Sequence, residues 1–183
     1  MKRLKTVLTI GLVITMLFPV TSCGKRITEY SEDSIITILE DDLGIDEDEI
    51  YTYENHREQN GLPDAEIVTA RYGDARINAM FIDDPDEAKQ EFDNYYDEFT
   101  DSFDANGQFD GNYVYENSDG YGYIVVNGTD IGTQVFGSRF ATGEVFIGLY
   151  YTGSMLISVT PEDMDGNLDD VGEVIASLGF PNV

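Results

Sequence analysis

The feature that most constrains the fold is a series of short, strand-like segments in the second half of the chain, separated by turns that contain glycine. The segments are rich in Tyr, Val, Ile and Phe, the residue types that favour strands. Because the connections are too short to hold a crossover helix, neighbouring strands must run antiparallel. The sequence therefore predicts a five-stranded antiparallel meander with strands at residues 113–115, 121–126, 133–140, 144–151 and 155–160.

Three other segments have the hydrophobic period of amphipathic helices. The first, residues 31–43, begins with a favourable N-cap at Ser31. The last has a cap-and-proline start signal at Thr160-Pro161, carries its apolar residues between 168 and 178, and ends at Gly179. The second and clearest starts at Asp84-Pro85, because proline favours the first helical position. We interpret its aromatic stripe as a core face rather than a ligand groove. The stripe consists of Ala88, Phe92, Tyr95, Tyr96, Phe99 and Phe103.

Three earlier segments are strand-like, and the second and third are joined by a sequence that suits a tight hairpin turn. These segments are residues 50–53, 66–72 and 76–82. The chain thus gives a helix, a few strands, a long helix, the meander and a closing helix. This order predicts an α+β fold, an antiparallel β-meander packed on about three helices, and we expect the helices to cover one face of the sheet.

The first 22 residues have the three parts of an export signal: basic residues, an apolar run and small residues before the expected cut. The apolar run, residues 7–20, is shorter than the roughly 20 apolar residues that a spanning helix needs. We therefore expect cleavage rather than a transmembrane helix. The rest of the chain is long enough for one compact domain with a hydrophobic core.

The leader ends in Val20-Thr21-Ser22-Cys23. This stretch resembles the bacterial lipobox, an aliphatic residue and two small residues before a cysteine, with Val20 where leucine is most usual. The resemblance covers only the leader and the first mature residue. It implies that the Cys23 thiol carries a diacylglycerol, that the chain is cut before it and that the new amino group is open to acylation. An ordinary buried thiol, or a cysteine that follows a plain secretory signal by chance, is the alternative.

On this interpretation residues 1–22 are a lipoprotein signal peptide, residues 23–30 a lipid-anchored tether and residues 31–183 a single α+β domain. The tether reaches no more than roughly 30 Å when extended. We expect the mature protein to lie outside the cytoplasm on a bacterial cell membrane, anchored through the lipid on Cys23.

The mature chain is strongly acidic, because all 36 acidic residues and only seven of the ten basic residues follow the leader. Binding to nucleic acid depends largely on Lys and Arg that neutralise phosphates, so we exclude nucleic acid as a partner. The excess of negative charge favours neutral or cationic partners, and we expect an extracytoplasmic protein or a polysaccharide. The alternative role of this charge is solubility and self-repulsion on a crowded surface.

Few residues suit catalysis or a transition metal. The chain has one cysteine and one histidine, and His56 lies in a polar segment where a solvated side chain is the simpler interpretation. No sequence motif of a serine hydrolase, a zinc protease or a phosphate-binding loop is present, and we predict no cofactor. A small hydrolase that uses paired carboxylates stays an alternative, because so many acidic residues always include some pair at a workable separation.

One segment after the long helix partly resembles the calcium loop of an EF-hand. Asp104 and Asn106 occupy the third and fifth places, and Asp110 lies further along. Ser102 stands at the first ligand position, and Tyr113 stands at the twelfth, where the pattern requires Glu. Turn formation and helix capping are the alternative roles for these residues and for a second acidic cluster. That cluster contains Asp163, Asp165, Asn167, Asp169 and Asp170.

Four tyrosines form a possible recognition strip in the meander: Tyr113, Tyr115, Tyr121 and Tyr123. Because side chains alternate along a strand, the two tyrosines of each strand point to one face. That face is either part of the core or an exposed surface for a protein or a polysaccharide. Our leading hypothesis is a non-catalytic, membrane-anchored binding module, with the carboxylate-based hydrolase and a calcium-dependent surface module as alternatives.

Overall fold

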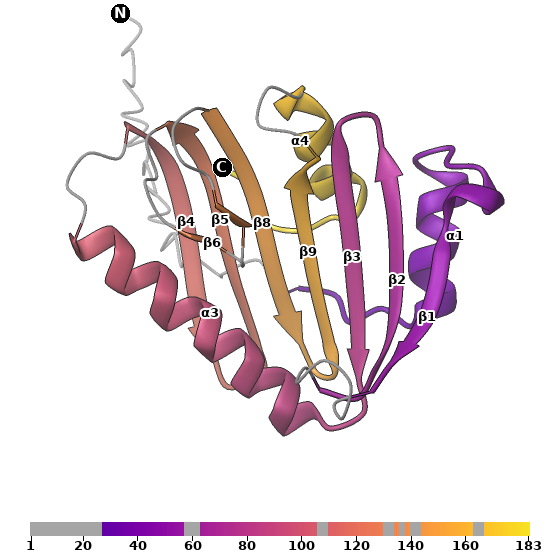
Figure 1. The fold of residues 1–183 in the computed structure, drawn as a ribbon, viewed down its shortest axis with the longest axis horizontal. Coiled ribbons are helices and arrows are strands. Elements are labelled where there is room, and N and C mark those ends of the chain that lie inside the picture. The colour runs from indigo at the N-terminus through magenta and orange to yellow at the C-terminus, as the bar shows by residue number, and fades with distance from the viewer. Residues whose placement is uncertain are drawn as a thin grey trace, which may run out of the picture.

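The centre of the molecule is a seven-stranded antiparallel sheet with the strand order β1-β2-β3-β9-β8-β5-β4 (Figure 1). The computed structural model describes residues 27–56, 63–105, 110–129, 134–135, 138–139, 144–162 and 167–183. The strands of the sheet are β1 (Tyr51–Asn55), β2 (Ala65–Tyr72), β3 (Ala75–Ile82), β4 (Asp110–Ser118), β5 (Tyr121–Thr129), β8 (Glu144–Thr152) and β9 (Met155–Pro161). The predicted α+β class, with an antiparallel sheet and helices packed on it, is confirmed.

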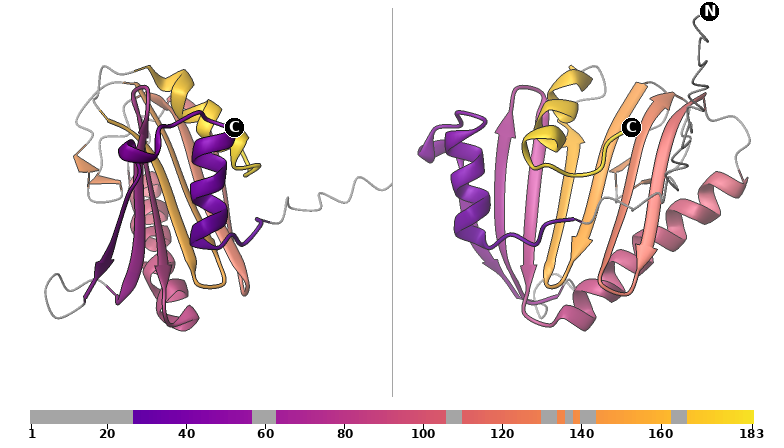
Figure 2. Two further views of the ribbon diagram at one scale, coloured as in Figure 1. Left: turned by 90° about the vertical axis from the view of Figure 1, so that its right-hand side faces the viewer. Right: turned by 180° about the vertical axis from the view of Figure 1, so that it is seen from behind.

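Helices cover both faces of this sheet. The long helix α3 (Pro85–Ala105) crosses one face diagonally, whereas α1 (Glu32–Asp41) and α4 (Leu168–Ser177) lie on the opposite face (Figures 1 and 2). A short 3₁₀ helix, η1 (Glu47–Glu49), precedes β1. The expectation that the helices cover one face is therefore wrong. The reason is visible in β8, where every residue after the first is buried, so both of its faces need a covering layer.

The meander contains four strands of the main sheet rather than five. β5 pairs directly with β8, from Tyr121 opposite Thr152 to Thr129 opposite Glu144. The described parts of the predicted strand 133–140 are β6 (Gln134–Val135) and β7 (Ser138–Arg139), which pair with each other in a separate small hairpin. β9 then pairs with β3, and this contact joins the meander to the first three strands.

Two hydrophobic clusters lie on the two faces of the sheet. The described part of the aromatic stripe of α3 is a core face, as predicted: Ala88, Phe92 and Phe99 are buried, and Tyr95 and Tyr96 pack against the same cluster. The side chain of Phe103 lies outside the described part of the chain. Phe92 lies directly on the backbone of β5, because a Cβ atom added at Gly122 would come within 2.3 Å of its ring. The other cluster holds α1, α4 and the facing side of the strands together.

Residues 27–30, the end of the predicted tether, are packed against the domain. Ile27 is only 4% exposed and belongs to the cluster on the α1 and α4 side of the sheet. The Tyr30 hydroxyl donates to the carbonyl of Leu178 at 3.0 Å, and Glu29 accepts from the backbone N–H of Ser154 at 3.2 Å. The predicted leader and Cys23 lie outside the described residues.

Candidate functional site

The predicted calcium segment lies where α3 ends and β4 begins. The helix continues to Ala105, so Asp104 is on its last turn, and Asp110 is the exposed first residue of β4. Asn106 lies outside the described residues. Among the residues that the structure describes, no group of three or more His, Cys, Asp and Glu side chains could hold a metal ion.

The described residues of the second acidic cluster act as caps. Asn167 is the N-cap of α4 and accepts a hydrogen bond from the backbone of Asp169. The Asp170 carboxylate accepts from the backbone N–H of Asp74, and the Asp74 carboxylate accepts in turn from the N–H of Asn167, at 2.8 and 2.7 Å. These reciprocal bonds fasten the β2–β3 turn to the start of α4 and satisfy backbone groups that the helix leaves open. Asp163 and Asp165 are outside the described residues.

The single histidine is solvated. His56 follows the last residue of β1, and its Nε2 atom lies 3.6 Å from a carboxylate oxygen of Glu54, with both side chains more than half exposed. Such an exposed pair contributes little to stability.

The four predicted strip tyrosines divide between the two faces of the sheet. Tyr113 and Tyr115 stand opposite Val126 and Ile124, whose side chains belong to the α3 cluster. Tyr123 stands opposite Glu116, is buried in the cluster on the other face, and burial raises its pKa. Tyr121 also lies on that second face, half-buried, with its hydroxyl 3.2 Å from a carboxylate oxygen of Glu116.

Tyr113 and Tyr115 form an exposed aromatic pair on β4, at one end of the sheet. Each side chain is 46% exposed, and the two rings are parallel to within 4° with centroids 6.0 Å apart. Phe99 of α3 meets both rings edge-on, at 5.9 Å from Tyr115 and 6.4 Å from Tyr113, and Tyr96 meets Tyr115 at 5.7 Å. Because buried and half-buried rings support them from one side, the two tyrosines are held in place while their other sides face solvent.

A second exposed tyrosine pair lies at the opposite end of the sheet and was not singled out from the sequence. Tyr51 and Tyr53 of β1 are 61% and 54% exposed. They stand opposite Thr69 and Ile67, so they share the α3 face of the sheet with Tyr113 and Tyr115. The signal in the sequence is the same Tyr-X-Tyr alternation that identified the first pair.

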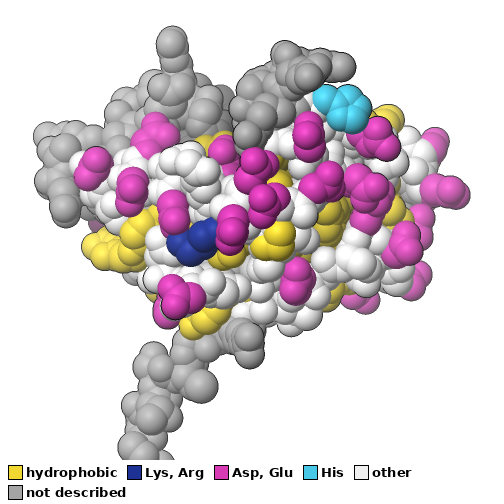
Figure 3. Space-filling model, turned by 90° about the horizontal axis from the view of Figure 1, so that it is seen from below, with side chains coloured by type: hydrophobic (Ala, Val, Ile, Leu, Met, Phe, Trp, Pro, Cys, Tyr) yellow, Lys and Arg dark blue, Asp and Glu magenta, His cyan; other side chains and the backbone are white. Residues whose placement is uncertain are grey.

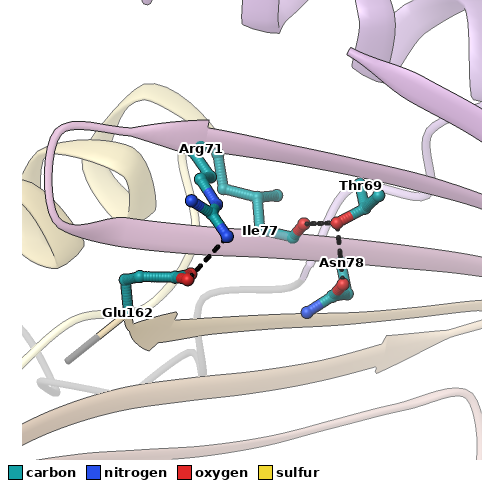
Figure 4. Close-up of polar contacts among 5 residues, drawn as sticks. All are labelled: Thr69, Arg71, Ile77, Asn78 and Glu162. Carbon is teal, nitrogen blue, oxygen red and sulfur yellow. Dashed lines mark hydrogen bonds and ion pairs between the residues drawn. The ribbon is translucent and has the colours of Figure 1, made fainter. Parts of the chain in front are cut away.

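Tyr51 borders a pocket of about 650 Å³ on the part of this face beside η1, β2 and the β2–β3 turn. Arg71 and Arg76 line the pocket and stand directly opposite each other in the hairpin. Arg71 forms an ion pair with Glu162 at 2.7 Å, as Figure 4 shows. Two positions further along the same strands, the Thr69 hydroxyl donates to the Ile77 carbonyl at 3.1 Å and lies 2.9 Å from the side-chain amide oxygen of Asn78 (Figure 4). These bonds fix the polar side chains of the strands.

Acidic side chains are spread over the described surface. Seen from below, Asp and Glu are scattered across the whole described part of the face, with Lys or Arg in one small area (Figure 3). None of the helices in the described part of the chain is both long and apolar enough to cross a bilayer.

Comparison with known proteins found no matching family model, no matching curated protein and no matching solved structure. The function must therefore be inferred from the geometry itself.

Proposed function

We propose that this chain is a lipid-anchored, extracytoplasmic binding module without catalytic activity, and that the Tyr113–Tyr115 pair is its contact surface. The observation that carries the proposal is the pair of parallel, half-exposed rings supported by Phe99 and Tyr96. Tyrosine gives a large contact area at a small cost in side-chain entropy. Rings that are already held in position lose still less on binding, so the pair is suited to recognition.

The negative net charge of the chain makes an anionic partner unfavourable. With 36 acidic residues against ten basic ones, the chain repels anionic polymers at long range. The Tyr113–Tyr115 rings offer an apolar face and two hydroxyl groups, which suit both a protein surface and the faces of sugar rings. We therefore propose a neutral or cationic protein or polysaccharide of the cell envelope as the partner.

The anchor has its own test. In the native protein, mass spectrometry should find a mature N-terminus at Cys23 with the mass of a diacylglycerol and any further acyl chain. The Cys23→Ser variant should lose this modification and leave the membrane fraction or accumulate as precursor. An unmodified Cys23 thiol, or unchanged membrane association of correctly processed Cys23→Ser protein, would refute the anchor.

Two assays test the contact surface, and each compares the wild type with the Tyr113→Ala/Tyr115→Ala variant. The first is co-sedimentation of the detergent-solubilised protein with purified cell-wall polysaccharide. The second is cross-linking of the protein to its neighbours in intact cells. We expect the variant to lose about tenfold or more of its binding, because buried tyrosines often dominate contact energies. Val114→Ala is the matched control, since Val114 is exposed on the other face of the same strand. Equal binding by wild type and double variant in both assays would overturn this surface.

A further inference from the structure

The pocket beside Arg71 and Arg76 lies on the part of the α3 face that the helix does not cover. α3 packs over the apolar part of the sheet, where Ile67 and Leu156 belong to its cluster. Beyond them, the same face continues with polar residues: Thr69, Asn78 and Ser158 are adjacent on neighbouring strands. The next row, nearer the β2–β3 turn, consists of Arg71, Arg76 and Thr160. The two arginines of this polar area are exposed, and its other members are partly exposed.

The placement of the two arginines is unfavourable for the fold alone. Like charges directly opposite each other on one face of an antiparallel pair are destabilising. The Glu162 carboxylate offsets the charge of Arg71 at 2.7 Å, but among the described residues Arg76 forms no ion pair. Lys89 is the only lysine in the described part of the chain, and its side chain pairs with Asp93 on α3. Arg76 is thus an exposed cation without an ion-pair partner among the described residues, in a chain that is rich in carboxylates.

Arg76 lines a pocket rather than lying on a flat surface. The pocket volume of about 650 Å³ lies in the range of small-molecule sites. Tyr51 supplies an aromatic wall, and the hydrogen bonds of Thr69 keep the strand residues below the arginines in place. A guanidinium group presents several N–H donors in a plane, which matches the two oxygens of a carboxylate or phosphate.

We propose that this pocket binds an oxyanion carried by a small ligand or a chain end, with Arg76 as the main contact and Arg71 as the second. Glu49 also lines the pocket, and Glu162 shares Arg71, so a ligand group with a single negative charge is favoured over one with two. A carboxylate and a phosphodiester both meet this condition. The proposal depends on neither the lipid anchor nor the Tyr113–Tyr115 pair.

The site is tested by NMR on the purified full chain with ¹⁵N-labelled arginine, through the side-chain Nε–H signals. The probes are acetate and dimethyl phosphate, each titrated against chloride at constant ionic strength, with inorganic phosphate as the more highly charged comparison. We expect saturable shifts of two arginine signals with acetate or dimethyl phosphate at millimolar concentration. The stronger of these two probes identifies the ligand group as a carboxylate or a phosphodiester.

Variants separate a specific site from general attraction to positive charge. Arg76→Gln should weaken binding about tenfold or more, since hydrogen bonds to charged groups are each worth about one such factor. Lys89→Gln removes the same charge elsewhere and should leave binding unchanged, and Glu162→Gln should strengthen it by releasing Arg71. An equal response to chloride, or equal weakening by Lys89→Gln and Arg76→Gln, would overturn the proposal. So would tighter binding of inorganic phosphate than of both singly charged probes.

Discussion

One cross-strand row passes through all seven strands of the sheet, and its two halves differ in chemistry. From β1 to β9 the row is polar, except for the tyrosine on β1, and from β8 to β4 the row is apolar. Its members in order are Tyr51, Thr69, Asn78, Ser158, Leu149, Ile124 and Tyr115. α3 covers the apolar half and leaves the polar half open (Figure 1). The position of the helix thus follows from the side chains of the strands, because apolar positions need cover and polar positions do not.

The largest expected difference between the halves concerns aromatic side chains. Phe92→Ala should lower the free energy of unfolding by about 3–5 kcal/mol, because a fully buried ring is replaced by a cavity. Tyr53→Ala, at an exposed ring of the open half, should cost less than about 1 kcal/mol. Urea denaturation of both variants measures the difference. Similar midpoints for the two would contradict the assignment of covered and open halves.

The turns of the two halves should also respond differently. Gly73, in the β2–β3 turn, has φ +54°, and an added Cβ would come within 2.2 Å of the Asp170 carboxylate. Gly73→Ala should therefore cost about 1–3 kcal/mol through backbone strain and loss of the bond to α4. Gly120, in the β4–β5 turn, has open space around its Cβ position, so Gly120→Ala serves as the control and should change stability by less than about 0.5 kcal/mol. Equal effects in thermal unfolding would contradict the role of the bonds that Asp74 forms with Asp170 and Asn167 in holding the turn.

Alkaline pH should destabilise the folded chain through Tyr95, a half-buried tyrosine of α3. Burial, and secondly the Glu91 carboxylate, raises the pKa of Tyr95 to about 12. The unfolded chain releases this proton near its ordinary value of 10, so the folded state binds more protons in between. The contribution of Tyr95 to stability is therefore complete below pH 10 and is lost as the pH rises towards 12. In the Tyr95→Phe variant, the free energy of unfolding, measured by urea denaturation at several pH values, should fall less steeply between pH 10 and 12 than in the wild type.

The smallest effect is expected at the arginines of the open half. Arg76→Gln removes a like charge opposite Arg71, so the free energy of unfolding should stay the same or rise by up to about 0.5 kcal/mol. Denaturation at low and high salt measures this effect, which screening should reduce. A loss of more than about 1 kcal/mol would assign Arg76 a structural role and weaken the case for a ligand.

The sequence predicted the fold class and most elements because hydrophobic period and turn residues are local signals. The helix beginning at Pro85 and the strands of the β2–β3 hairpin were found within two residues of their observed limits. We did not predict from the sequence that helices cover both faces of the sheet, although the nearly continuous apolar run of β8 indicates a strand that is buried on both faces. Segment 133–140 was assigned to the sheet because its composition is strand-like, but pairing partners are not encoded locally.

The candidate sites were also predicted only in part, because contacts between distant parts of the chain are not encoded locally. The Tyr113–Tyr115 pair was found from alternation, but whether a strand face is buried depends on distant elements such as α3, so Tyr121 and Tyr123 were grouped with it. The cross-strand placement of Arg71 and Arg76 follows from the hairpin register, which a turn sequence suggests. Glu162, which neutralises one of them, is 91 positions further along the chain and could not be placed beforehand.

The contacts of residues 27–30 with the domain bear on the proposed lipid anchor. Ile27 and Tyr30 are fastened to the layer formed by α1 and α4. With the proposed lipid on Cys23, only three residues, or about 14 Å of extended backbone, would separate Cys23 from Ile27, a fixed point on the domain. On the proposed anchor, this short connection would hold the α1–α4 side near the bilayer, and the tyrosine pairs and the arginine pocket, which lie on the α3 face, would point away from it.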